Sequence, residues 1–155
     1  MLIENQEDFT AALPKEGRLL GLDVGETTIG LALSDVLRGI ATPFNTIERK
    51  KFSKDIEHLK KTIADQKVCG LVIGYPINMD GSLGARTQSV RTFVSNISKQ
   101  IALPMLLWDE RMSTMAVEKM MLEADMSRKR RAELVDKLAA SYILQGYLDK
   151  IKAIG

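Results

Sequence analysis

The chain has 155 residues, of which 45% are hydrophobic and 27% charged, and its formal net charge is +2, a balance that predicts one compact domain with a single core. The longest apolar run, residues 101–108, contains Pro104 and is far shorter than the roughly 20 residues that cross a bilayer, so no membrane span is expected. The first residues include acids and lack the basic and apolar regions of a secretory signal, which favours a cytoplasmic protein.

Residues 1–17 form a polar lead-in, with a short helix expected at residues 8–13 and ended by Pro14. Residues 18–155 then form the single domain. Its first three segments are typical of strands, and we expect them at residues 18–24, 28–33 and 42–47. The short connector that contains Gly25 predicts an antiparallel hairpin between the first two.

From Ser53 onward the pattern predicts alternating helices and strands. The expected helices and strands are, in order, a helix at 53–66, a strand at 68–73, a helix at 83–100, a strand at 105–108, and helices at 114–123 and 127–152. Connections of this length join parallel strands and cover the sheet with helices. The predicted fold is α/β, a mixed five-stranded sheet of three antiparallel strands followed by two strand-helix units, flanked by helices.

Three acidic residues stand at or near the ends of apolar elements. Asp23 lies between Leu and Val in the first strand, Glu110 follows the strand at 105–108, and Asp136 lies in the last helix. An unpaired buried carboxylate costs several kcal/mol, so such acids must be compensated or used. Because side chains alternate along a strand, only one of Asp109 and Glu110 is expected on the side of Asp23, and Asp109 is a competing candidate.

Asp136 shares an inward helical face with Ala140, Ile143 and Tyr147. No basic residue stands three or four positions away, so an ion pair within the helix is not available to it. Plainer alternatives stay open for all three acids: a strand-end turn residue at position 23, an ion pair with Arg111 at position 110, and a solvated surface acid at position 136.

A cluster of carboxylates would suit Mg²⁺ or Mn²⁺, which prefer oxygen ligands. The chain has one histidine, His58, and one cysteine, Cys69, which excludes a structural zinc site with four Cys or His ligands. His58 lies beside the apolar stripe of its helix and is expected at the surface rather than as a catalytic base.

Two regions carry positive charge for a phosphate backbone. Four successive cations follow Ser127, which resembles a helix N-cap, and each opposes the helix dipole by about 0.3 kcal/mol or more. This unfavourable choice favours a phosphate-binding role over the plainer alternative, a solvated surface. The residues are Arg128, Lys129, Arg130 and Arg131. A smaller cluster is Arg49-Lys50-Lys51.

The segment at residues 75–82 follows a strand and enters a helix, and its Pro and Asp-Gly signals predict an exposed turn. It can be an ordinary connecting loop. It can also present the backbone N–H groups of a helix start near Ser82 to a phosphate, with Arg86 or Arg91 supplying charge.

Four ordered segments resemble the YqgF family of RuvX-type Holliday junction resolvases, also described as pre-16S ribosomal RNA nucleases, in the RNase H-like superfamily. The resemblance runs from about residue 19 to 148. It rests on Gly21-Leu22-Asp23-Val24-Gly25 with residues 29–35, Gly74-Tyr75-Pro76 with Met79-Asp80-Gly81-Ser82, Asp109-Glu110-Arg111-Met112-Ser113-Thr114, and Val135-Asp136-Lys137-Leu138-Ala139-Ala140.

The resemblance implies an RNase H-like fold with Asp23, Glu110 and Asp136 as the catalytic and metal-binding acids. It implies a metal-dependent nuclease that uses Mg²⁺ or Mn²⁺ and cleaves structured RNA or branched DNA. The expected role is processing of precursor 16S ribosomal RNA or resolution of Holliday junctions. A two-fold junction would favour a homodimer.

Two other classes stay open. One is a non-catalytic RNA-binding factor for ribosome assembly that keeps this fold. The other is an actin-like ATPase or a sugar-kinase-type phosphate-binding domain, whose first phosphate motif resembles residues 23–28. Such enzymes hold a nucleotide between two domains of this kind, whereas this chain has the length of one.

Overall fold

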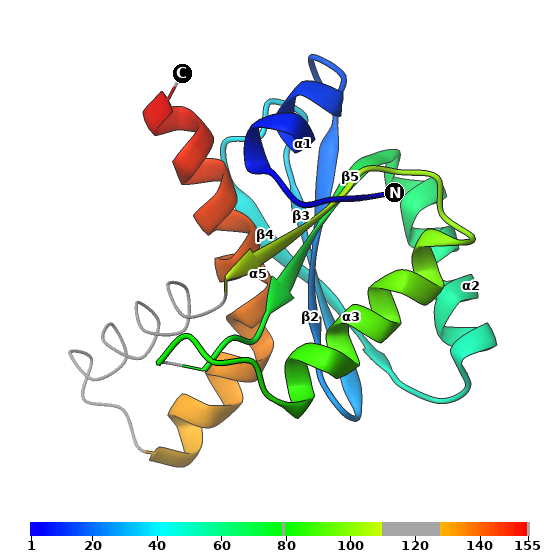
Figure 1. The fold of residues 1–155 in the computed structure, drawn as a ribbon, viewed down its shortest axis with the longest axis vertical. Helices are drawn as coiled ribbons and strands as arrows, with labels where there is room; N and C mark the ends of the chain where they lie inside the picture. Colours follow the sequence, from blue (N-terminus) through cyan, green and yellow to red (C-terminus); the bar gives the residue numbers. More distant parts are fainter. Residues whose placement is uncertain (79, 110–127, 155) are drawn as a thin grey trace.

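The computed structural model describes residues 1–78, 80–109 and 128–154, with side chains only for residues 138–152 in the last of these stretches. In chain order the elements are β1 (Leu2–Ile3), α1 (Gln6–Ala12), β2 (Arg18–Val24), β3 (Thr28–Ser34), β4 (Ala41–Glu48), α2 (Phe52–Gln66), β5 (Val68–Tyr75), α3 (Ala85–Ser98), β6 (Met105–Asp109) and α5 (Arg128–Ile154) (Figure 1). The predicted α/β order is confirmed, and the helix expected at 114–123 lies outside the described residues.

The strands form one mixed sheet in the order β1-β6-β5-β2-β3-β4. As predicted, β2, β3 and β4 are antiparallel neighbours, and β5 and β6 are parallel to β2. The sheet has six strands rather than the five expected, because β1 of the lead-in pairs with β6. A strand of two residues is too short to show the alternation of apolar and polar side chains by which strands are predicted.

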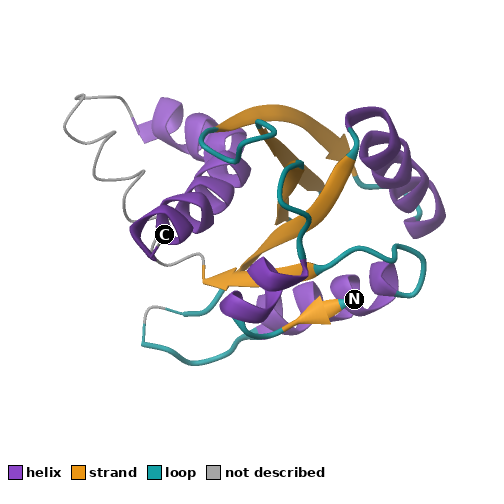
Figure 2. Ribbon diagram, turned by 90° about the horizontal axis from the view of Figure 1, so that it is seen from above, coloured by secondary structure: helices purple, strands orange, loops and turns teal. Residues whose placement is uncertain are grey.

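Helices cover both faces of the sheet (Figure 2). On one face, the side chains of α2 and α3 pack against alternate residues of the strands, and Ile56 and Phe93 belong to this core. On the other face, α1 and α5 pack against the remaining strand residues through Phe9, Leu144 and Tyr147. Among the described residues, no helix is both long and apolar enough to cross a membrane.

Helix α5 approaches β2 closely at Gly21. A Cβ atom added to Gly21 would lie 2.8 Å from the backbone oxygen of Ala140 and 2.8 Å from the Cβ of Leu144. Real Cβ contacts are longer, so any side chain at this position would push the helix away from the sheet. The close approach is made by two small residues: Gly21 on the strand has no side chain, and the buried Ala140 on the helix has only a methyl group.

The direction of α5 follows from its contacts with the start of β4. The Ala41 amide donates to Gln145 Oε1 at 2.8 Å, and Lys152 Nζ donates to the Gly39 carbonyl at 2.8 Å. The start of β4 pairs with the end of β3, which lies beside the amino end of β2. The C-terminal part of α5 is therefore at the amino end of β2, and its first turns lie toward the β2–β3 hairpin (Figure 1).

Candidate active site

The candidate site lies where three parallel strands end. β2, β5 and β6 run in the same direction and end at Val24, Tyr75 and Asp109. Their carboxyl ends therefore meet at one edge of the sheet, which is where open α/β sheets bind ligands. Asp23 is the second-last residue of β2 and stands at this edge, as predicted from the sequence.

Glycine flanks Asp23 on both neighbouring strands. Asp23 is directly opposite Gly30 of β3. On the other side, Leu22 is in register with Ile73, so Asp23 lies level with the next residue of β5, Gly74. The strand residues directly beside Asp23 therefore add no side chain next to its carboxylate.

Asp23 and Asp109 face opposite sides of the sheet. Leu22 packs in the core under α2 and α3, so strand alternation turns Asp23, which is half-buried, to the α5 side. Asp109 is in register with Tyr75, whose buried ring belongs to the α2 and α3 core. Asp109 is therefore disfavoured as the partner of Asp23, and Glu110 lies outside the described residues.

The backbone of α5 brings position 136 level with Asp23. Asp136 precedes Ala140 by four residues, about 6 Å along a helix, and Asp23 follows Gly21 by two residues, about 6.6 Å along a strand. Both displacements start at the contact between Gly21 and Ala140 and run toward the carboxyl end of β2. The side chain of Asp136 lies outside the described part of the chain, so the convergence of the three acids stays a prediction.

No group of three or more His, Cys, Asp or Glu side chains that could hold a metal ion occurs among the described residues. Of the predicted triad, these include the side chain of Asp23 only. The predicted set of oxygen donors is nevertheless the kind that Mg²⁺ or Mn²⁺ requires.

The predicted phosphate loop is held by its own hydrogen bonds. The backbone N–H of Asn78 donates to the Ser82 carbonyl at 3.0 Å, and Ser82 Oγ donates to Asp80 Oδ1 at 2.6 Å. Helix α3 begins at Ala85, later than the start expected near Ser82, with Gly84 as its N-cap. Gly81 has a φ of 88°, and the turn it makes keeps the next residues out of the helix.

The two arginines proposed for this region differ in their surroundings. Arg86 is exposed in the first turn of α3. Arg91 donates to Tyr75 Oη at 2.7 Å and lies over the Tyr75 ring, with its Cζ 5.2 Å from the ring centroid. The hydrogen bond to Tyr75 raises the pKa of Arg91. Arg91 is thus tied to the sheet, whereas Arg86 faces solvent.

The predicted basic run, Arg128 to Arg131, forms the first turn of α5 in the backbone, and its side chains lie outside the described residues. Position 131 precedes Asp136 by five residues, about 7.5 Å along the helix. The run therefore begins the helix at the same end of the sheet as Asp23.

From the sequence, Arg49 was noted only as a member of the basic cluster Arg49-Lys50-Lys51, with no place relative to the predicted acids. It follows β4 directly, and its Nη1 donates to the Gly25 carbonyl at 2.6 Å, in the hairpin next to Asp23. Its position at the end of a strand predicted to join the antiparallel hairpin was the available signal. The register of β4 against β3, which decides that Arg49 reaches Gly25, is not contained in the local pattern.

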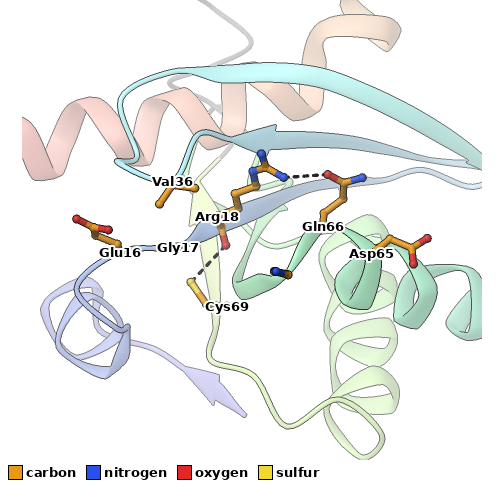
Figure 3. Close-up of a pocket in the computed structure, with 8 residues that line it drawn as sticks. Glu16, Gly17, Arg18, Val36, Asp65, Gln66 and Cys69 are labelled. Atoms are coloured by element: carbon orange, nitrogen blue, oxygen red, sulfur yellow. Dashed lines mark hydrogen bonds between the residues drawn. The ribbon is translucent and has the colours of Figure 1, made fainter.

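A hollow of about 530 Å³ lies at the opposite end of the sheet from Asp23 (Figure 3). It is lined where β2 and β5 begin, and Cys69 Sγ donates there to the Arg18 carbonyl at 3.3 Å. Arg18 Nη1 also donates to Gln66 Oε1 at 3.1 Å. None of the predicted site residues lines this hollow.

The chain is similar to known proteins along nearly its whole length. A family model described as "RuvX: Holliday junction resolvase" matches residues 17–150. A protein of Rhodobacter capsulatus named "Putative pre-16S rRNA nuclease" is 57% identical over 155 residues, covering 100% of this chain and 98% of the relative. A Paracoccus denitrificans protein of the same name is 52% identical over 155 residues, with the same coverage.

Among solved structures, RuvC of T. thermophilus in complex with Holliday junction substrate has a similar fold. Its TM-score is 0.53 at 13% sequence identity, and the match covers 87% of this chain and 96% of RuvC. At this identity the likeness concerns the fold alone, and it agrees with the predicted RNase H-like architecture.

Proposed function

The chain belongs to the RuvX family, and from this premise we propose that it is a nuclease that hydrolyses phosphodiester bonds in structured nucleic acid. The observation that carries the proposal is the placement of Asp23. It stands at the carboxyl end of β2, between two glycines and on the face that α5 covers. Position 136 of that helix is level with it. Asp23, Glu110 and Asp136 are the proposed catalytic acids.

Precursor 16S ribosomal RNA is the first substrate to test, because relatives with 52% and 57% identity carry that name. Junction DNA is the second, because the matching family is described by it. On a two-fold junction, a homodimer would place one site on each of two equivalent strands. Either substrate is compatible with a cytoplasmic protein.

The three acids would hold Mg²⁺ or Mn²⁺ at this edge of the sheet, since carboxylate oxygens are the ligands these ions prefer. When bound, such ions supply an activated water and stabilise the leaving oxygen. The residues of this chain position the acids. β2 holds Asp23 through its pairing with two strands, and the close approach of α5 at Gly21 would let Asp136 reach the same site. Glu110 would be turned to the same face if β6 continued for one more residue.

The test presents purified protein with a four-way DNA junction and a precursor 16S ribosomal RNA fragment in parallel, with Mg²⁺, with Mn²⁺ and with a chelator. We expect cleavage of the RNA that the chelator abolishes. Tight RNA binding without cleavage under either metal would favour the non-catalytic assembly factor instead. Hydrolysis of ATP without any nucleic-acid cleavage would favour the phosphate-binding domain of an actin-like enzyme.

Neutralising the basic run tests its contact with phosphates. Changing Arg128, Lys129, Arg130 and Arg131 to Gln should weaken nucleic-acid binding and flatten its salt dependence. Salt dependence is the slope of the logarithm of the binding constant against the logarithm of the salt concentration. Each lost phosphate contact reduces the steepness of this slope by about 0.9 on duplex DNA and about 0.7 on single strands. Cleavage should fall at low substrate concentration and recover partly at saturation, because the acids are untouched.

The control removes four exposed charges elsewhere, by changing Lys60, Lys61, Lys67 and Lys99 to Gln. It alters the net charge equally and should leave the slope nearly unchanged. If the run at 128–131 is only a solvated helix start, its variant will keep the slope of the unaltered protein and gain slight stability from relief of the dipole conflict.

A further inference from the structure

We propose that Arg49 and Arg86 form a phosphate-binding pocket on the α3 side of the strand ends. It would hold a backbone phosphate of the substrate that neighbours the cleaved one. This assignment rests on the proposed nuclease function and adds to it a second binding site for the substrate strand.

The pocket is a cavity of about 130 Å³ between the β2–β3 hairpin and the start of α3. This is well below the roughly 300–1,000 Å³ of pockets that take drug-sized ligands. A phosphate group suits this volume better than a nucleoside does. The lining residues are Val24, Gly25, Glu26, Arg49, Ala85, Arg86 and Ser89.

Arg49 is held in place from two sides. Its Nη1 donates to the Gly25 carbonyl at 2.6 Å, and its Cζ lies 5.4 Å from the centroid of the Phe93 ring. The Arg49 backbone amide also donates to the Thr27 carbonyl at 2.8 Å. A guanidinium has five N–H donors, so the bond to Gly25 occupies one and others can meet a phosphate. Because the side chain is already ordered, binding costs little side-chain entropy.

The charge of the lining favours an anion. The lining residues carry two positive charges, on Arg49 and Arg86, and one negative charge, on Glu26. Ser89, one helical turn after Ala85, adds a hydroxyl group that can donate to a phosphate oxygen. The cavity also lies at the start of α3, a helix of 14 residues, whose dipole adds to the attraction.

The pocket and the candidate active site share one strand end. Val24, which lines the pocket, faces the α2 and α3 core, whereas Asp23 before it faces α5. A nucleic-acid strand that crosses the carboxyl edge of the sheet can therefore present one phosphate to the acids and a neighbouring one to Arg49 and Arg86. The two arginines would set where the substrate strand lies relative to the acids.

The test is the double variant Arg49→Met and Arg86→Met, which keeps apolar side chains of similar length and removes both guanidinium groups. Binding to a single-stranded RNA and to a four-way DNA junction is titrated at several salt concentrations, with a chelator present. The log-log slope should fall by about 1.4 on the RNA and about 1.8 on the duplex arms, for two lost contacts. Arg49→Lys keeps the charge without the planar fork and should bind with intermediate affinity.

The matched control, Lys60→Met and Lys99→Met, removes two exposed charges near the other end of α3, where Lys60 Nζ donates to Gln100 Oε1. The assignment of the pocket would be wrong if this control reduced the salt-dependence slope equally, or if the double variant left the slope unchanged. Melting curves check that each variant is folded. Should the loss of Arg49 prevent folding, Arg86→Met alone, an exposed change, is expected to lower the slope by about half as much.

Binding without metal separates this inference from the reaction. If the unaltered protein binds but never cleaves with Mg²⁺ or Mn²⁺, the proposed nuclease activity fails while the change in slope still decides the pocket. If the protein cleaves and the double variant keeps its slope, only the pocket fails. If the unaltered protein binds no nucleic acid, both are wrong.

Discussion

Replacing Asp23 with Asn is expected to lower cleavage about a thousandfold or more and to leave the fold intact. Metal-assisted catalysis is worth several kcal/mol, and each 1.4 kcal/mol is tenfold in rate. Asn has the same size and can still form hydrogen bonds, but it lacks the charge that binds a cation. The melting temperature should stay equal or rise, because Asn removes the repulsion between like charges, which is about 4 kcal/mol for two charges about 4 Å apart at an effective dielectric near 20.

The matched control is Asp109→Asn, at the end of β6. Asp109 is in register with Tyr75 and faces the α2 and α3 side of the sheet, away from Asp23. It should keep most of the cleavage. Rates are measured at saturating substrate with protein freed of carried-over metal. Magnesium-dependent cleavage by Asp23→Asn would mean that other residues do the chemistry, and a loss in Asp109→Asn instead would reverse the assignment of faces.

Replacing Gly21 with Ala is expected to destabilise the protein and to impair cleavage together. The new Cβ would lie 2.8 Å from the Ala140 carbonyl oxygen and 2.8 Å from the Leu144 Cβ, so α5 must move. Overpacking of this kind costs about 1–3 kcal/mol, or roughly 2–12 °C in melting temperature for a chain of this size. A shift of about 1 Å at position 136 can cost about a hundredfold in rate.

Gly39→Ala is the control for this change. A Cβ at Gly39 would lie 3.8 Å from Asp35 Oδ1 and 3.8 Å from Lys152 Nζ, which is ordinary contact distance. Its melting temperature and cleavage should remain close to those of the unaltered protein. A Gly21→Ala protein that loses stability yet cleaves at the full rate would show that the distance between α5 and β2 does not position the acids.

The elements themselves were predictable because their signals are local. β2 was predicted with both ends correct, since an apolar run and the hairpin glycine Gly25 bound it. The expected ends of α2 and β5 differ from the structure by at most two residues, because periodicity marks each of them within its own segment. The start of α3 was placed too early, since the turn with Gly81 at positive φ depends on hydrogen bonds among residues 78–82.

The sequence by itself determined the α/β fold, the family and the place of Asp23 at a strand end. Helices and strands have local signals, and the family is recognised from short motifs in a fixed order along the chain. The tertiary structure decided what depends on pairing between distant segments. It placed β1 beside β6, separated the faces of Asp23 and Asp109, and brought Arg49 to the hairpin. Strand register sets which side chains share a face, and a shift of one residue would reverse it, so no local pattern contains this information.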